Sequence, residues 1–359
     1  MPTLRSAADG IVPAAEAGTR VPDAGRVPHR GPGAGIALGL LSAMCFGTSG
    51  TFGAALEEAG WSPAGAVLAR VCVAAAALTV PTLFALRGRW TLLRRSWRQV
   101  IVYGLVGVAA CQLGYYNAIA HMDVGISILL EYLGIILVVG WLWVRHGQRP
   151  QPLTVLGGVA ALGGLGLMLQ LSGSGGVSLV GVLSALGAAA AMAVYFFQSA
   201  APPGADEADL LPPVALTWGG MVTGGAAIAA LGLTRAMPLR FAASPVTLLN
   251  TQVSWLVPVL GIGIIAAAIA YVVGIATVRR LGPKLGSFVS MAEVLFAAGF
   301  AWVLLHQVPT GMQFLGGTLI LAGVVAVRLD MTVRRVVAVA MLVAVLVRVV
   351  VPMSIRMVV

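Results

Sequence analysis

Charged side chains are scarce in this sequence: Asp, Glu, Lys and Arg make up 9% of the 359 residues, whereas hydrophobic residues make up 59%. Soluble globular domains carry about 25% charged residues. A chain this apolar has too little polar surface to cover a soluble core, so a soluble enzyme or binding domain is excluded. Long apolar stretches with few charges instead predict an all-α integral membrane protein with many spans.

Cysteine and lysine are also rare. The three cysteines, Cys45, Cys72 and Cys111, all lie within apolar stretches, and no pair has the spacing of metal ligands. They support neither a disulfide framework nor a zinc site, and no cofactor is expected. The single lysine, Lys284, accompanies 21 arginines in a chain of net charge +10. Most of these arginines stand between apolar stretches, which indicates membrane orientation and no nucleic-acid partner.

Ten apolar runs follow a polar N-terminal tail. The tail, residues 1–33, is rich in Ala, Gly, Pro and charge, lacks the apolar core of a signal peptide, and predicts cytoplasmic disorder. The runs are 34–55, 65–86, 100–120, 124–144, 153–172, 178–198, 213–233, 252–277, 285–305 and 311–328. Each is close to the ~20 residues that a helix needs to cross a bilayer.

Residues 331–359 form an extra apolar segment that is rich in Val and Arg and contains no acid. Only 12 uncharged residues separate Arg335 from Arg348, or about 18 Å of helix, which is shorter than a span. The segment could lie at the membrane surface as a basic apolar helix, or form an eleventh span with Arg348 reaching the interface. The interfacial interpretation is favoured.

Basic residues in the links set the orientation. With a cytoplasmic N-terminus, the inside segments hold 17 basic residues and the outside links hold only Arg235 and Arg240. The inside residues are Arg5, Arg20, Arg26, Arg30, Arg87, Arg89, Arg94, Arg95, Arg98, Arg145, Arg149, Arg279, Arg280, Lys284, Arg328, Arg334 and Arg335. Because Lys and Arg concentrate on the cytoplasmic side, the N-terminus is expected inside. The expected location is the cytoplasmic membrane of a bacterium, with the lipid bilayer as the surrounding partner.

Two stretches of the chain show the same order of features. Residues 127–166 and 287–324 each contain an apolar run with an early Glu, a Trp near its end, a Pro in the link, and then Leu-Gly-Gly. Each half of the chain holds five runs, and because five is odd the second half enters the membrane from the opposite side. The sequence therefore predicts ten transmembrane helices as two inverted five-helix repeats, 34–172 and 178–330.

The two early acids, Glu131 and Glu293, are the strongest candidate functional residues. They lie about seven and eight residues into their runs, or ~11–12 Å from opposite faces of the apolar core. An acid inside a membrane is a functional candidate, because it can bind and release a proton or pair with a cationic substrate. The alternative is a protonated Glu that donates one hydrogen bond between helices.

Arg70 is the only cation well inside the ten runs. It could anchor an anionic group or pair with Glu131. The alternative is that its side chain reaches the outer interface, where Glu57 and Glu58 could neutralise it. This interfacial alternative is slightly favoured.

A polar patch, CQLGYYNAIAH, ends the third run. Gln112 and Tyr116 are four residues apart and share a helix face, so they could line a cavity together with Asn117. Tyr271 on the eighth run is a weaker candidate. Hydrogen bonds between helices are the alternative role for these side chains.

Glycines are frequent in the fifth and tenth runs, where Gly157, Gly158, Gly163, Gly164, Gly316, Gly317 and Gly323 occur. They lie inside apolar helices and no Lys follows them, so they do not form a phosphate loop. Small residues let helices approach closely in lipid, and helix packing is the predicted role.

These features resemble the EamA family of the drug/metabolite transporter superfamily over about residues 34–330. The resemblance rests on the two five-helix halves, the early Glu in helices four and nine, the Gly-rich helices five and ten, and Arg70 early in helix two. The family commonly has Glu-Pro where this chain has Glu131-Tyr132 and Glu293-Val294, and the family's Gly-Glu acids at the ends of these helices are missing from both halves. The resemblance implies that helices one to four and six to nine enclose a central cavity, with helices five and ten at the periphery. It also implies transport of small metabolites or drugs.

The predicted function is a secondary transporter that moves a small molecule by alternating access, with protons as coupling partners and with export favoured over uptake. Two alternatives are a membrane-embedded enzyme acting on lipid and a non-transporting membrane partner. The four scattered histidines argue against the enzyme, since no catalytic cluster is evident. The inverted repeat argues against the non-transporting partner. A homodimer is left open.

Overall fold

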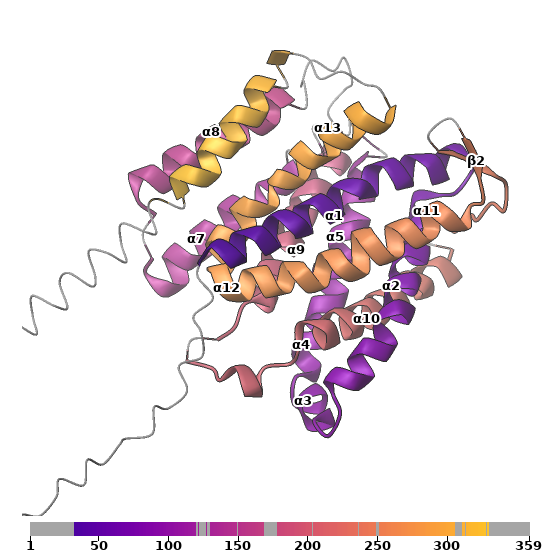
Figure 1. Ribbon diagram of the computed structural model, residues 1–359, viewed down its shortest axis with the longest axis horizontal. Helices are drawn as coiled ribbons and strands as arrows, with labels where there is room; N and C mark the ends of the chain where they lie inside the picture. Colours follow the sequence, from indigo (N-terminus) through magenta and orange to yellow (C-terminus); the bar gives the residue numbers. More distant parts are fainter. Residues whose placement is uncertain are drawn as a thin grey trace, which may run out of the picture. The chain divides into compact units, whose positions relative to one another are not determined.

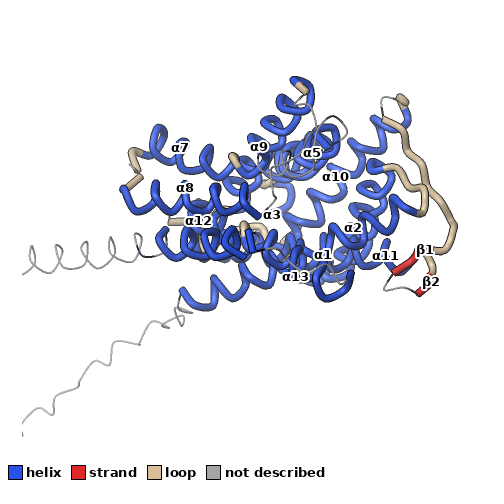
Figure 2. The backbone as a smooth tube through the Cα atoms, turned by 90° about the horizontal axis from the view of Figure 1, so that it is seen from above, coloured by secondary structure: helices blue, strands red, loops and turns tan. Residues whose placement is uncertain are grey.

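The computed structural model describes residues 32–119, 121, 127, 130–148, 150–168, 178–202, 204–235, 237–248, 251–305, 311–312, 314–327 and 329. The predicted disorder of the N-terminal tail and the predicted interfacial helix over residues 331–359 fall outside these residues. Within them, the chain is helical apart from one short antiparallel hairpin, β1 (Val246–Leu248) with β2 (Thr251–Val253) (Figure 2). The expected all-α class is confirmed.

Among the residues that the structure describes, six helices are long and apolar enough to cross a membrane, judged by length and composition. They are α1 (Pro32–Glu58), α2 (Pro63–Ala85), the continuous stretch α4 (Trp97–Val102), η1 (Tyr103–Ala110) and α5 (Cys111–Ile119), α9 (Leu179–Ser199), α10 (Pro213–Leu233), and the stretch α11 (Leu256–Leu260), η3 (Gly261–Ile269) and α12 (Ala270–Ser290). Shorter helices are α3 (Trp90–Arg95), α7 (Gly134–His146), α8 (Pro152–Met168), η2 (Glu207–Asp209), α13 (Ala292–Leu305) and Phe314–Val327. Every apolar run predicted from the sequence contains helix.

Helices from each half of the chain pack against helices from the other half. α1 packs against η3, α12 and α13, and α2 packs against η3. In the reciprocal arrangement, α9 packs against η1, α5 and α7, and α10 packs against η1. Figure 1 shows α1 running beside α12 and α13. The same pairings, with first and second half interchanged, are expected of two related repeats.

A glycine and a proline separate the eighth and ninth predicted runs within α12. Gly282 has φ 78° and ψ 165°, and Pro283 follows it. Glycine adopts positive φ without steric cost, and proline has no N–H to continue the helical hydrogen bonds. The chain therefore changes direction here, and the second part of α12 leads into α13.

Close glycine contacts join α8 to the helix Phe314–Val327, which lies beside it (Figure 1). A Cβ atom added at Gly164 would stand 2.5 Å from the Gly316 carbonyl oxygen, and one added at Gly157 would stand 2.8 Å from the Gly323 carbonyl oxygen. No side chain fits between backbones this close, so these glycines serve helix packing, as predicted.

Ser62 joins the link that precedes α2 to the link that follows α10. Its Oγ accepts hydrogen bonds from the N–H groups of Gly65 (3.1 Å) and Arg240 (2.9 Å), and donates one to the Pro238 carbonyl oxygen (2.7 Å). The first of these bonds caps the N-terminus of α2, where Pro63 occupies the first helical turn. One buried hydroxyl thus connects segments more than 170 residues apart.

We expect Ser62→Ala to lower the free energy of unfolding by about 2 kcal/mol, because it leaves buried backbone groups without partners. Ser244→Ala is the matched control, since the exposed Ser244 hydroxyl donates only one bond, to the Ala59 carbonyl. Denaturant titration of both purified proteins in one detergent measures the difference. Equal denaturation midpoints for the two variants would contradict the proposal that Ser62 stabilises the protein by connecting the two links.

Candidate functional site

Glu131 and Glu293 come from different halves of the chain and belong to one polar cluster. Glu131 lies in a short helical stretch before α7, and Glu293 is the second residue of α13. Both side chains are half-buried. Glu293 acts electrostatically on Glu131, and both act on Cys111 and Tyr132. The structure therefore brings the two acids singled out in the sequence near each other.

Each acid has one hydrogen-bond donor from the cluster. Cys111 Sγ donates to Glu131 Oε1 at 3.4 Å, and the Tyr132 hydroxyl donates to Glu293 Oε2 at 3.3 Å. Tyr132 follows Glu131 in the sequence but contacts the other acid. The helical turn that carries Glu131 therefore also contacts the carboxyl group of Glu293, through Tyr132. The sequence alone does not reveal this contact, because Tyr132 and Glu293 are 161 positions apart.

A tight turn interrupts the helix next to each acid. The Leu133 N–H bonds to the Leu130 carbonyl and the Met291 N–H bonds to the Phe288 carbonyl, each at 3.2 Å and three residues back. The backbone angles agree closely, with φ −58° and ψ −17° at Leu133 and φ −60° and ψ −20° at Met291. Neither turn contains a proline. Both helices therefore have a local irregularity within two residues of the carboxyl group.

Arg70 points into the bundle. Its side chain is 5% exposed, and its Nη1 and Nη2 donate to Ser49 Oγ (3.1 Å) and to the Ala266 carbonyl (2.7 Å). The guanidinium carbon stands 6.0 Å from the centre of the Phe46 ring. The interfacial position favoured from the sequence is therefore wrong, because η3 offers a backbone acceptor that the sequence does not reveal. Arg70 acts electrostatically on Glu293.

Gln112 and Tyr271 connect the two halves directly. The Gln112 side-chain amide donates to the Tyr271 hydroxyl at 3.2 Å. Gln112 is the second residue after the π-helical segment η1, and Tyr271 is the second residue after the π-helical segment η3. Segments of π-helix are rare and frequent at functional sites. Matching positions of the two halves thus meet beside the acids, and neither π segment could be predicted from the sequence.

The other residues of the predicted polar patch take different positions. Tyr116 is half-buried, and Arg70 acts on it electrostatically, so it lies with the cluster. Asn117 is exposed and its Nδ2 donates to Ser184 Oγ of α9 at 2.7 Å. The structure therefore does not bring Asn117 into the cluster. The central polar cluster comprises Arg70, Cys111, Gln112, Tyr116, Glu131, Tyr132, Tyr271 and Glu293.

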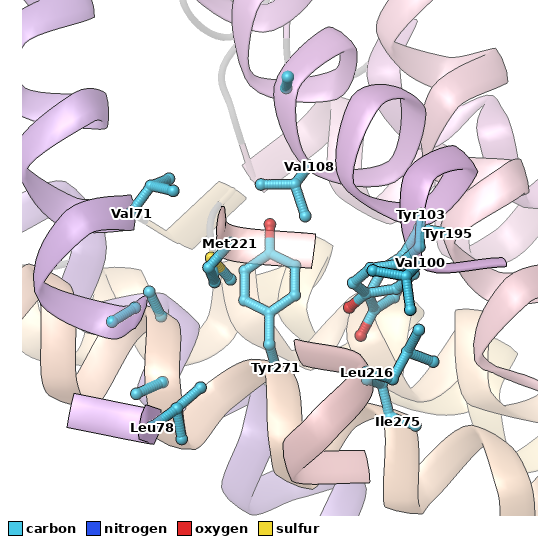
Figure 3. Packing of buried hydrophobic residues seen from close by; sticks show 14 of the residues in the cluster. Val71, Leu78, Val100, Tyr103, Val108, Tyr195, Leu216, Met221, Tyr271 and Ile275 are labelled. Atoms are coloured by element: carbon cyan, nitrogen blue, oxygen red, sulfur yellow. The ribbon is translucent and has the colours of Figure 1, made fainter. Parts of the chain in front are cut away.

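Aromatic rings close one side of this cluster. The ring centroids of Tyr195 and Tyr103 are 5.7 Å apart, and those of Tyr195 and Tyr271 are 5.6 Å apart. Tyr103 is fully buried, whereas Gln112 and Tyr116 on the other side remain half-buried. Figure 3 shows the Tyr271 hydroxyl directed away from the hydroxyls of Tyr103 and Tyr195. The buried aromatic rings thus lie on the side of the cluster toward Tyr103, which follows the Arg-rich link before α4.

No metal centre is indicated in the part of the chain that the structure describes: it holds no group of three His, Cys, Asp or Glu side chains placed to bind an ion. The three cysteines are free thiols. The carboxyl groups of the cluster can exchange protons, and its polar side chains can make ionic or hydrogen-bond contacts with a small molecule.

Long apolar helices around paired acids define a multi-pass membrane protein of the transporter class. The model of the EamA-like transporter family matches residues 33–170 and 179–329. The chain therefore belongs to the EamA-like transporter family and carries two EamA domains; the family consists of transporters and not of enzymes.

Comparison with solved structures supports the fold. One of them, described only as "Crystal structure of protein", is 20% identical, with a TM-score of 0.66, and the alignment covers 82% of this chain and 98% of that chain. At this identity the likeness concerns the fold alone. No curated protein matches the chain.

Proposed function

We propose that the chain is a secondary transporter that moves a small metabolite or drug-like molecule across the cytoplasmic membrane of a bacterium, in the direction of export. The observation that carries the proposal is the pair Glu131 and Glu293. Opposite halves of the chain supply them, each has one donor, and both stay half-buried. Intramembrane acids of this kind mark substrate or proton pathways.

The proposed architecture has ten spans in two inverted five-helix repeats, 34–172 and 178–330, with tails at residues 1–33 and 331–359. The exchanged helix pairings support it, since α1 contacts η3, α12 and α13 as α9 contacts η1, α5 and α7. The matched π segments η1 and η3 support it as well. The arginine-rich links favour a cytoplasmic N-terminus.

In the proposed cycle, the central polar cluster is closed alternately at one end of the protein and then at the other. The buried rings of Tyr103, Tyr195 and Tyr271 close the Arg-rich end, which is the proposed cytoplasmic end. Opening that end requires these rings to separate while the opposite end closes. The turns at Leu133 and Met291 give the acid-bearing helices points at which they can bend.

Protons couple the cycle through the carboxyl groups. A charged carboxylate is costly in an apolar interior unless it is paired, whereas the protonated form is neutral. Release of a proton from Glu131 or Glu293 therefore favours the state in which that acid meets water or a charged partner. The substrate is proposed to contact Arg70, Gln112, Tyr116 and Tyr271. Asn117, which bonds to Ser184 away from the cluster, is left out of this lining.

Comparing metabolites inside and outside cells tests this function. Cells with the wild-type chain are compared with cells that lack it, and a redistributed compound is then tested with purified protein in liposomes. Saturable movement of that compound across the liposome membrane supports the transporter. Absence of flux for every redistributed compound would remove the proposal.

A further inference from the structure

Arg70 is a buried cation whose donors are only partly used. A guanidinium group has five N–H donors, and the hydrogen bonds of Arg70 within the described residues go to Ser49 and to the Ala266 carbonyl, both neutral. In the described ranges of the chain, no carboxylate oxygen comes within the 4.0 Å that defines an ion pair with this side chain. A buried charge without a paired counter-ion is strongly unfavourable.

The surroundings of Arg70 fit an anion with an apolar body. Its charged and titratable neighbours, with the elements that present them, are Cys111 and Tyr116 on α5, Tyr271 on α12 and Glu293 on α13. The Phe46 ring lies against both the guanidinium group and the Tyr271 ring, whose centroid is 5.0 Å away. A ligand beside Arg70 would therefore meet one cation and three aromatic rings.

Arg70 and Glu293 adjoin the same turn of α1. Ser49 and Phe46 of this turn contact Arg70. A Cβ atom added at Gly47 would stand 3.1 Å from the Glu293 carbonyl oxygen. The Glu293 backbone thus adjoins this turn and Arg70 acts electrostatically on Glu293, whereas Glu131 accepts a hydrogen bond from Cys111.

We propose that Arg70 binds the acidic group of a small organic anion, and that this anion replaces the Glu293 carboxylate as the counter-ion of Arg70. The proposal rests on the transporter function and names its substrate class. Without the anion, the negative Glu293 carboxylate balances the positive guanidinium at longer range, with no direct ion pair between them. With the anion bound, Glu293 takes up one proton from the solvent, and the site is again neutral.

This exchange couples one proton to one anion. The anion without the proton would leave one negative charge in excess, and the proton without the anion would leave one positive charge in excess. Either imbalance is unfavourable in an apolar interior. Anion and proton therefore cross the membrane together, and the proposed export requires an outward gradient of the anion that exceeds the inward proton gradient.

Cys111 serves as a reporter of the charge at this site, because its thiol is half-buried and lies beside Glu131. The test uses the full chain in liposomes with Cys45→Ala and Cys72→Ala, so that Cys111 is the single thiol. Two methanethiosulfonates of similar size are compared: the anionic sulfonatoethyl and the cationic trimethylammonioethyl reagent. The ratio of the two rates cancels the thiolate fraction of Cys111, and normalising it to the same ratio for a free thiol in solution cancels the intrinsic reactivities of the reagents.

The anionic reagent is expected to react preferentially, and its preference is expected to grow as the pH falls and the carboxyl groups become neutral. Arg70→Gln is expected to lower the anion-to-cation ratio by about tenfold, whereas Arg70→Lys retains most of it. Arg87→Gln, at an exposed arginine, is the matched control and is expected to leave the ratio unchanged.

A cationic preference in the wild type, or a ratio that Arg70→Gln does not change, would overturn the anion site and leave the transporter function standing. Failure of both reagents to label Cys111 would instead contradict an accessible central cluster, and with it the proposed function. If Arg70→Gln does not fold, the pH trend of the wild type and the ratio for Arg70→Lys decide the matter.

Discussion

Glu293→Gln is expected to reduce net transport to below about 1% of the wild-type rate, because the substituted side chain cannot bind and release a proton. Gln has nearly the same shape and its side-chain oxygen can still accept the Tyr132 hydrogen bond, so the fold is expected to persist. The measurement is the initial rate of proton-driven accumulation in liposomes, with the compound identified from cells. Glu131→Gln is expected to have a similar effect.

A substrate-exchange assay distinguishes a loss of proton coupling from a loss of substrate binding. Exchange of labelled for unlabelled substrate needs no net proton movement, so it is expected to continue in Glu293→Gln at a rate near that of the wild type. The neutral Gln resembles the protonated, substrate-loaded form, and the block falls on the return of the empty carrier, in which Arg70 has no counter-ion. Loss of exchange together with net transport would assign Glu293 to substrate binding instead.

Glu58→Gln provides the matched control for these variants. Glu58 is an exposed acid at the end of α1, outside the central polar cluster. Its replacement removes the same charge from the chain and is expected to leave both net transport and exchange unchanged. Net transport at the wild-type rate in both Glu131→Gln and Glu293→Gln would show that the acids are structural.

The helices and the meeting of the two acids could be predicted from the sequence because both follow from apolar length. A run of about 20 apolar residues has few alternatives to a long helix, and the equivalent positions of Glu131 and Glu293 in two similar runs predict that the two acids lie near each other. The close approach at Gly157 and Gly164 was predictable for the same reason, since glycine in an apolar helix has few roles other than packing.

The partners of the acids could not be predicted, because they depend on helix rotation and on local irregularities. Tyr132 stands next to Glu131 in the sequence, but the turn of the helix directs its hydroxyl to Glu293. The predicted interfacial position of Arg70 was wrong because its side chain donates to a backbone carbonyl of η3. The position of a backbone acceptor cannot be predicted from the residue types. The π segments could not be predicted either, since their residues are ordinary Gly, Ala, Val and Ile apart from Tyr103 and Leu105 in η1.

Gly164→Ala is expected to destabilise the protein by about 1–3 kcal/mol, because the added methyl group has no room. Its Cβ would stand 2.5 Å from the Gly316 carbonyl oxygen and 2.7 Å from Leu319 Cβ. A backbone carbonyl cannot rotate away as a flexible side chain can, so α8 and the helix Phe314–Val327 must separate and lose contacts along the whole interface. Denaturant titration in detergent, followed by tryptophan fluorescence, measures the loss.

Gly163→Ala separates this steric effect from the intrinsic preference of alanine for helix. Gly163 is the preceding residue on α8, and a Cβ atom there meets nothing within 4 Å. Its replacement is expected to be neutral, or stabilising by up to about 1 kcal/mol, because alanine is the better helix former. Equal stability of the two variants would show that α8 and Phe314–Val327 do not depend on close backbone contact. A loss confined to Gly164→Ala locates the requirement for glycine on the face of α8 that meets Gly316.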